Sequence, residues 1–203
     1  MYARVAAFEQ SDGSIVDELI DTVRERSRSA RTELPDARAF LMLVDRENAR
    51  SLGITFFESE EAIRQAEPAF ERMGDEIPEE MRGRRISVDV YEVVRQEGGE
   101  GARAARVSSF EGPPDKIDEG VRQAERDVLP RARQLPGWNG YYWLADRSSG
   151  RAKLITLFES IDAVRASEQQ ANELRRQSAE AAGETITGVE RYEVALSEQL
   201  AVR

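Results

Sequence analysis

The feature of this sequence that most constrains its fold is an internal repeat. The stretch from Leu34 to Ile63 recurs from Leu135 to Val164 at a constant offset of 101 positions, without insertion or deletion. Both copies share a Leu-Pro pair, an Asp-Arg pair, an Arg, an Ile-Thr pair, a Phe-Glu-Ser triplet and an Ala. A chain of 203 residues is long enough for two small hydrophobic cores. We therefore predict two similar units, residues 1–95 and 104–203, joined by a glycine-rich linker at 96–103.

Each copy shows the same order of predicted elements. In the first copy, apolar runs bounded by polar turns predict strands at 4–8, 39–44, 52–57 and 86–94. Apolar residues at helical spacing predict helices after Ser14 and after Ser59, and both serines are suitable N-caps. The second copy predicts strands at 106–110, 140–145, 152–158 and 188–196, with helices from Ile117 and after Ser160. Pro68 is expected to kink its helix, and Pro130 to bend or restart the helix before it.

The resulting order, β-α-β-β-α-β, predicts a ferredoxin-like unit with two helices on one face of a four-stranded antiparallel sheet. Both faces of the predicted strands carry apolar residues, including Phe57 and Phe158. A bare phenylalanine-rich sheet face is costly in water. We therefore predict an α+β fold in which the two repeats form one intramolecular barrel with the helices outside.

The absence of two residue types excludes much catalytic chemistry. The chain contains no cysteine and no histidine. It therefore has no thiolate nucleophile, no disulfide, no histidine general base, and no nitrogen or sulfur ligand of the usual kind for zinc or haem iron. Carboxylate, Tyr, Arg or Asn chemistry, an oxygen-ligand metal site, or simple binding remain.

The charge and hydropathy patterns bear on partners and location. The net charge of −10 disfavours nucleic acid and anionic membranes as partners, because both are bound through excess Lys and Arg. No apolar run approaches the roughly 20 residues of a membrane-spanning helix, and the N-terminus does not have the pattern of a signal peptide. We therefore expect a cytoplasmic protein that associates with neither.

Two short motifs resemble those of a known superfamily. In both copies a strand ends in an aromatic residue followed by Glu-Ser and an alanine-containing acidic helix start, as in Phe57 to Ala62 and Phe158 to Ala163. This pattern resembles the dimeric α+β barrel superfamily. The Pro-Gly-Trp-Asn-Gly-Tyr sequence from Pro136 to Tyr141 looks most like its antibiotic biosynthesis monooxygenase branch, here in tandem duplication.

The resemblance implies several alternative activities. Members of that branch pair two copies to complete the barrel, and each half can enclose a pocket between its sheet and its helices or loops. Some oxidise polycyclic phenols with O₂ and no cofactor, some degrade haem, and many have no assigned activity. Haem-degrading members use a His, an Asn and a Trp, whereas this chain has no His and has Phe57 and Phe158 where a Trp is typical. The resemblance therefore favours a site without a cofactor or metal.

The two copies differ most in the second strand, which directs attention to the second unit. Both tryptophans of the chain, Trp138 and Trp143, fall there beside two tyrosines and an asparagine. Polar groups on an aromatic wall would suit a planar phenolic ligand. The predicted substrate-binding residues are Asn139, Tyr141, Tyr142, Trp143, Thr156 and Phe158. The alternative is that these aromatic residues only fill the core.

Two further pairs of matching residues have two interpretations each. Arg50 and Arg151 could bind an anion, or could form hairpin salt bridges with the aspartates five residues earlier; the second interpretation is preferred. Glu58 and Glu159 could be acid-base carboxylates, or could support the helix starts that follow them; again the second is preferred.

Two functional hypotheses follow. The first is a cofactor-independent monooxygenase acting on an aromatic small molecule, with Asn139, Tyr141 and Trp143 orienting the substrate. The alternative is a non-catalytic small-molecule-binding or structural protein. In either case the internal pairing of the repeats leaves two options for assembly, a monomer with an internal pseudo-dimer or a weak homo-oligomer.

Overall fold

A computed structural model describes residues 1–10 and 13–200. The first half contains β1 (Tyr2–Glu9), η1 (Gly13–Ile15), α1 (Val16–Glu33), β2 (Ala37–Asp45), β3 (Arg50–Phe57), α2 (Glu60–Asp75), α3 (Glu79–Arg82) and β4 (Arg84–Gly98). The second half contains β5 (Ala104–Glu111), η2 (Pro114–Lys116), α4 (Ile117–Asp127), α5 (Leu129–Ala132), β6 (Trp138–Asp146), β7 (Arg151–Phe158), α6 (Ile161–Ala166), α7 (Glu168–Ala182) and β8 (Thr185–Gln199). The predicted order of strands and main helices is confirmed in both copies.

The chain divides into two compact units. Of the described residues, 1–10, 13–90 and 194–200 form the first, and residues 91–193 form the second. The predicted linker at 96–103 begins within β4, whose residues as far as Gly98 pair with β6. The boundaries between the compact units fall instead within the long strands β4 and β8. The division at 96–103 therefore stays a prediction drawn from the sequence repeat.

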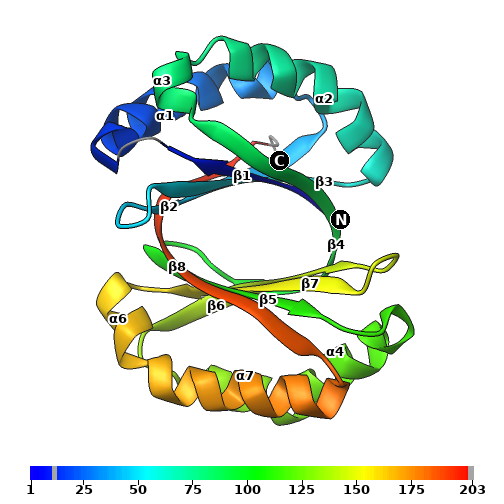
Figure 1. Ribbon diagram of the computed structural model, residues 1–203. Coiled ribbons are helices and arrows are strands. Elements are labelled where there is room, and N and C mark those ends of the chain that lie inside the picture. Colours follow the sequence, from blue (N-terminus) through cyan, green and yellow to red (C-terminus); the bar gives the residue numbers. More distant parts are fainter. Residues whose placement is uncertain (11–12, 201–203) are drawn as a thin grey trace. The chain divides into compact units, whose positions relative to one another are not determined.

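Both repeats have the same strand order. It is β4-β1-β3-β2 in the first repeat and β8-β5-β7-β6 in the second, all antiparallel where the registers are defined. Within each unit, two helices cover one face of the sheet, α1 and α2 in the first and α4 and α7 in the second (Figure 1). The hydrogen-bonded order of all eight strands closes on itself as a barrel. The predicted fold class is thus confirmed.

Serine caps start corresponding helices in the two repeats. Ser59 Oγ accepts a hydrogen bond from the backbone N–H of Ala62, and Ser160 Oγ accepts one from that of Ala163, each at 3.1 Å. After these starts the copies diverge: α2 continues through Pro68 to Asp75, whereas the second repeat breaks at Ser167 into α6 and α7. A new short helix, α5, begins at Leu129 with Pro130 in its first turn, which confirms the predicted restart.

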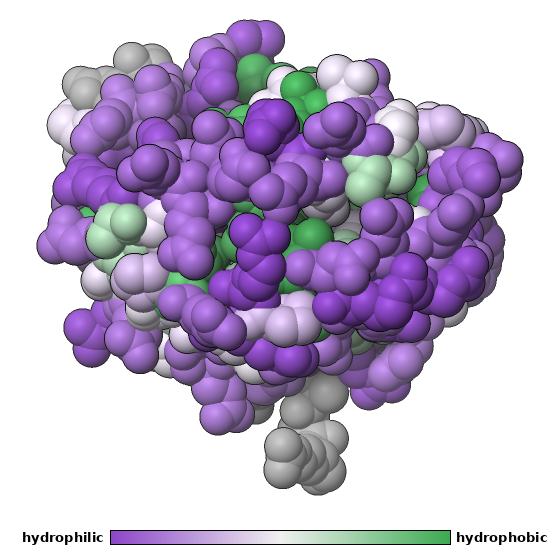
Figure 2. Space-filling model, turned by 90° about the horizontal axis from the view of Figure 1, so that it is seen from below, coloured by the Kyte–Doolittle hydropathy of each residue, from purple (hydrophilic) through white to green (hydrophobic). Residues whose placement is uncertain are grey.

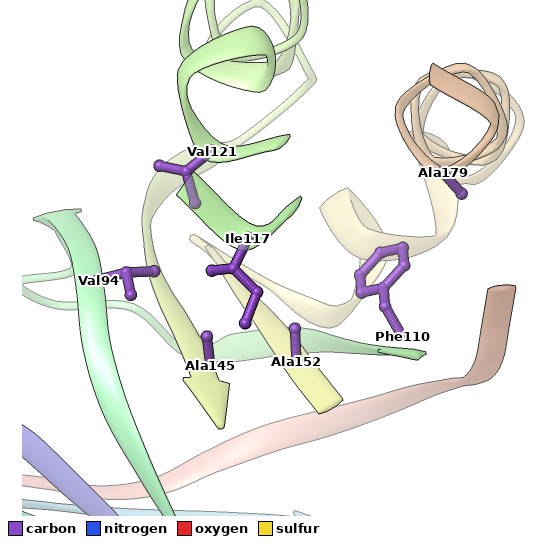
Figure 3. Close-up of a cluster of buried hydrophobic side chains, with 7 residues drawn as sticks. All are labelled: Val94, Phe110, Ile117, Val121, Ala145, Ala152 and Ala179. Atoms are coloured by element: carbon purple, nitrogen blue, oxygen red, sulfur yellow. The ribbon is translucent and has the colours of Figure 1, made fainter. Parts of the chain in front are cut away.

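Each unit has its own hydrophobic core on the helix-covered face. In the first unit Phe57 is fully buried with Ile63 of α2, and Leu200 packs in the same cluster. One core of the second unit joins side chains from four strands and two helices (Figure 3), namely Val94, Phe110, Ile117, Val121, Ala145, Ala152 and Ala179. The predicted apolar stripes therefore face the sheets.

The outer side of the second unit is largely polar. Figure 2 shows the face on which α4 and α7 lie in Figure 1, and hydrophobic residues are visible there mainly in gaps between hydrophilic side chains. Among the described residues, no helix combines the length and apolar composition needed to span a bilayer.

Candidate ligand-binding cavity

The first unit contains a cavity of about 930 Å³ on the helix-covered face of its sheet. Strand residues on this face include Ala6, Phe40, Met42 and Gly53, and the helices contribute side chains such as Phe70. Alternate residues of β1, at positions 4, 6 and 8, line the cavity, as expected for one face of a strand. The cavity therefore lies between a sheet and its helices within one unit.

The second unit has only about 70 Å³ of space in the corresponding place. The register explains the difference. Met42 pairs with Gly53 in the first unit, and Trp143 pairs with Leu154 at the matching positions of the second. A tryptophan and a leucine occupy the volume that a methionine and a glycine leave open. The cavity thus follows from two changes between the copies.

Arg4 supplies the cavity with a buried charged group. Its Nε and Nη2 donate to the two carboxylate oxygens of Glu67 at 2.8 and 3.0 Å. The guanidinium carbon also lies 4.0 Å from the centroid of the Phe70 ring, within cation–π range. The guanidinium is therefore oriented by both a carboxylate and an aromatic ring.

A second polar group, Gln10, lines the same cavity. Its side chain is 4% exposed, and its Nε2 donates to Ser51 Oγ at 2.9 Å. Its Oε1 is buried and has no hydrogen-bond partner among the described residues. Thr55 is another buried polar residue of the lining. The cavity therefore combines apolar walls with a few hydrogen-bonding groups.

The exposed charges that line the cavity are balanced by ion pairs. Four arginines of the lining each contact an acidic residue, and the pairs are Arg26 with Glu76, Arg82 with Asp75, Arg84 with Glu9, and Arg85 with Glu71. An anion would gain little from these arginines, because each already has a carboxylate partner. The lining therefore favours an uncharged, largely apolar ligand.

The structure brings together three of the six predicted site residues. Tyr141, Trp143 and Thr156 line the small cavity of the second unit. Burial raises the pKa of the Tyr141 hydroxyl, and nearby Glu97 and Glu125 raise it further. This phenol is therefore neutral at physiological pH.

The other three predicted residues are not part of that lining. Asn139 Nδ2 donates to the backbone oxygen of Glu100 at 3.1 Å, and Phe158 is fully buried in a core with Leu135 and Val164. Burial raises the pKa of the Tyr142 hydroxyl. The assignment of these six residues to a binding site stays a prediction.

The hairpin interpretation of Arg151 is confirmed. Its Nη2 lies 3.5 Å from Asp146 Oδ2 across the β6–β7 turn. In the first unit Asp45 and Arg50 face each other in the β2–β3 register. Glu58 pairs with Arg38, Nε to Oε1 at 3.0 Å, directly before the helix cap. Arg151 and Glu58 thus have ion-pair partners within the strand and helix framework, and Arg50 has a register partner there.

The part of the chain that the structure describes contains no cluster of side chains suited to bind a metal ion. No group of three or more Asp or Glu side chains is arranged to hold an ion there, and the chain has no His or Cys.

The large cavity has no tyrosine, tryptophan or asparagine among its lining residues. Sequence reasoning missed this cavity, although Gly53 opposite Leu154 in the repeat alignment was a signal for it.

Comparison with solved structures establishes the fold. An anthrone oxidase-like protein superposes with a TM-score of 0.69 at 12% identity, over 99% of this chain and 94% of that one. The chain has the dimeric α+β barrel fold. A ferredoxin-fold protein related to antibiotic biosynthesis monooxygenases, from Listeria monocytogenes, gives 0.53 at 11% identity over 95% and 94% of the two chains.

A haem-degrading enzyme from Listeria monocytogenes also has a similar structure. It gives a TM-score of 0.52 at 9% identity over 96% and 99% of the two chains. In sequence, this chain is 29% identical to the uncharacterised protein Rv2557 of Mycobacterium tuberculosis H37Rv, over 97% of this chain and 88% of the relative. No family model matches the chain. At these identities the structural similarities establish the fold alone.

Proposed function

We propose that this protein binds a largely apolar, aromatic small molecule in the cavity of its first unit. The observation that carries the proposal is the cavity of about 930 Å³ on the helix-covered sheet face. Pockets for small molecules commonly measure about 300–1,000 Å³ and combine apolar walls with a few polar groups. The Phe40, Met42 and Phe70 side chains provide such walls.

The polar groups of the cavity favour a ligand with a hydroxyl or a similar donor. The buried Oε1 of Gln10 is an acceptor without a partner among the described residues, and Thr55 offers a hydroxyl. A ligand donor that reached Gln10 would remove the free-energy cost of this unsatisfied acceptor. A phenol or an anthrone-like polycycle combines such a group with a planar apolar body.

Cofactor-independent monooxygenation is the second candidate function. It is supported by Arg4, a guanidinium in an apolar cavity, and by the likeness of the fold to an anthrone oxidase-like protein. In the proposed reaction an anthrone CH₂ loses a proton, and the carbanion is oxidised by O₂. One oxygen atom becomes the new carbonyl, and the other leaves as water with both hydrogens of the CH₂. Arg4 would stabilise the intermediate anion, although its pairing with Glu67 reduces this effect.

The second unit stays a proposed accessory site for an aromatic ligand. This proposal rests on the six substrate-binding residues that the sequence predicts, namely Asn139, Tyr141, Tyr142, Trp143, Thr156 and Phe158. Its support is that Tyr141, Trp143 and Thr156 line one cavity, but the space of about 70 Å³ is too small for a polycycle. The first unit is therefore preferred as the principal site.

Binding is tested by filling the cavity at Gly53. A Cβ at this position would meet only Phe40, at 3.7 Å, so Gly53→Ala should fold normally and bind an apolar fluorescent probe almost as wild type does. Gly53→Leu, which copies Leu154 of the second unit, should reduce probe and anthrone affinity by roughly tenfold or more. Circular dichroism would verify folding of both variants. Equal affinity in wild type and a folded Gly53→Leu protein would overturn the proposal.

Catalysis is tested separately with an oxygen electrode. Wild type with anthrone should consume one O₂ per anthraquinone formed, faster than the Gly53→Leu variant. Consumption no faster than in buffer would remove the monooxygenase candidate. It would leave the binding function standing if anthrone still bound.

A further inference from the structure

The second unit contains three guanidinium groups that share one carboxylate. Glu168 accepts from Arg106 Nη2 at 3.2 Å and from Arg175 Nη2 at 3.1 Å. It also accepts from Arg191, with Nη2 at 3.0 Å. Three positive charges thus surround a single negative charge, and an additional anion would balance this cluster better than water does.

Two of these arginines are buried and hold unused hydrogen-bond donors. Arg106 is 2% exposed and Arg175 is 6% exposed. Arg106 Nε, Arg175 Nε and Arg175 Nη1 have no acceptor among the described residues and are shielded from solvent. Buried donors on charged groups are costly to leave unpaired, so such groups commonly contact a water or a ligand.

Both arginines line the same cavity of about 70 Å³. Ser108 and Thr156 add hydroxyl groups to its lining, and Trp138 and Trp143 add apolar walls. A water molecule occupies about 30 Å³ of liquid, so the space suits about two waters or one small oxyanion. Planar guanidinium donors match the oxygen atoms of carboxylates and phosphates.

The first unit shows the balanced form of the same arrangement. Arg4 and Glu67, which correspond to Arg106 and Glu168 in the repeat, form a one-to-one pair with two hydrogen bonds. At the positions matching Arg175 and Arg191, offset by 101, the first unit has Gly74 and Val90. The extra positive charges are therefore particular to the second copy and are not required by the fold.

Other charged residues of this cavity do not supply the missing anion. Glu125 and Glu184 belong to its lining. Among the described residues, neither accepts a hydrogen bond from Arg106 or Arg175. Burial raises the pKa of Glu184. Burial lowers the pKa of Arg106; the charge of Glu168 raises this pKa, and the charges of Arg175 and Arg191 lower it. Within the described part of the chain, these carboxylates thus leave the unused donors of Arg106 and Arg175 without an acceptor.

We propose that Arg106 and Arg175 form a binding site for a small oxyanion, a carboxylate or phosphate group, in the second unit. The anion accepts hydrogen bonds from the unused donors of both guanidiniums. This site is separate from the apolar cavity of the first unit, and its ligand is a different chemical class. It takes up the space of about 70 Å³ that Tyr141, Trp143 and Thr156 also line, so an oxyanion and an aromatic ligand would exclude each other there.

The test is a titration of the full-length protein with sodium phosphate and with sodium acetate at constant ionic strength, against chloride. Isothermal calorimetry should show saturable binding of at least one oxyanion to wild type. Arg175→Met should weaken it by roughly tenfold or more, because charge-assisted donors are lost. Arg176→Met is the matched control, since Arg176 is exposed on the same helix and pairs with Glu173. It should bind as wild type does.

A second measurement keeps the test independent of variant folding. In wild-type protein labelled with ¹⁵N, the Nε–H resonances of Arg106 and Arg175 should shift with the oxyanion and saturate together. Unchanged resonances, or calorimetric binding unaffected by Arg175→Met, would overturn the proposal and assign water to these donors. The Gly53→Leu variant should keep oxyanion binding, which separates this result from the function proposed for the first unit.

Discussion

Arg4 and Glu67 are 63 positions apart in the sequence and meet through two hydrogen bonds, from Nε and Nη2 of one arginine to both oxygens of one carboxylate. The pair ties β1 to the middle of α2. Since Arg4 also lines the large cavity, the pair fixes a charged group beside the proposed ligand. It therefore serves both the stability of the first unit and the shape of its cavity.

Removing the charge of Glu67 should destabilise the protein. Glu67→Gln leaves the guanidinium of Arg4 buried without a counter-charge, so we expect a loss of about 1–2 kcal/mol, reduced by the partial exposure of Glu67. Urea unfolding followed by circular dichroism measures it. Glu61→Gln, which removes an exposed partner of Arg64 at the protein surface, is the control and should change little. An equal effect of both substitutions would contradict this account of Arg4.

The two serine caps should contribute equally in the two repeats. Ser59→Ala and Ser160→Ala each remove one hydrogen bond to a helix N-terminus, so each should lower the free energy of unfolding by about 1 kcal/mol. Replacement by Asp keeps an acceptor at the same place and should preserve most of the stability. Thermal denaturation of the four variants tests this, and an Ala variant as stable as its Asp counterpart would disprove the capping role.

Acid should remove a contribution made by Asp146. Hydrogen bonds from the side chains and backbone of Ser148 and Ser149 hold the pKa of this carboxyl well below its usual range. A carboxyl whose folded pKa is depressed stabilises the protein above its unfolded pKa, near about 3.9. That stability is lost as the pH falls towards the folded pKa. Wild type should therefore lose more stability than Asp146→Asn between about pH 5 and pH 2, measured by urea unfolding. Parallel pH profiles would contradict the assignment.

Gly137 should not tolerate a side chain. Its φ is 63°, and a Cβ there would lie 2.5 Å from the Cβ of Ala163. We expect Gly137→Ala to cost more than about 1 kcal/mol. Gly188→Ala is the matched control, because its nearest neighbour would be Ser109 at 3.9 Å. Chemical denaturation should separate the two variants clearly, and similar midpoints would argue against a close approach at Gly137.

The sequence was sufficient to predict the fold, because the repeat fixes the element order twice. The Phe-Glu-Ser motif placed a strand end and a helix cap in each copy, and both were found. The strands β4 and β8 extend further than predicted, each to 15 residues. Polar residues such as Gln96 and Glu97 have the composition of a linker, but their pairing with β6 keeps them extended.

The cavity of the first unit was harder to predict, because it exists where a residue has no side chain to fill the space. The tyrosines and tryptophans of β6 attracted attention to the second unit, where bulky side chains occupy most of the space. In the first unit Gly53 contributes no side chain, and only the register shows that it lies opposite Met42. The shared carboxylate Glu168 was also invisible in the sequence, since its three arginines come from β5, α7 and β8.

The end of β8 has a consequence for synthesis. Leu196 and Leu200 pack in cores of the first unit, and the backbone N–H of Leu200 donates to Arg38 O at 2.9 Å. The first unit is therefore incomplete while the second is being translated, and its cores close only when the residues after Val194 leave the ribosome. A nascent chain stalled before that point would expose the apolar face of β2 to chaperones, whatever the folding state of the second unit.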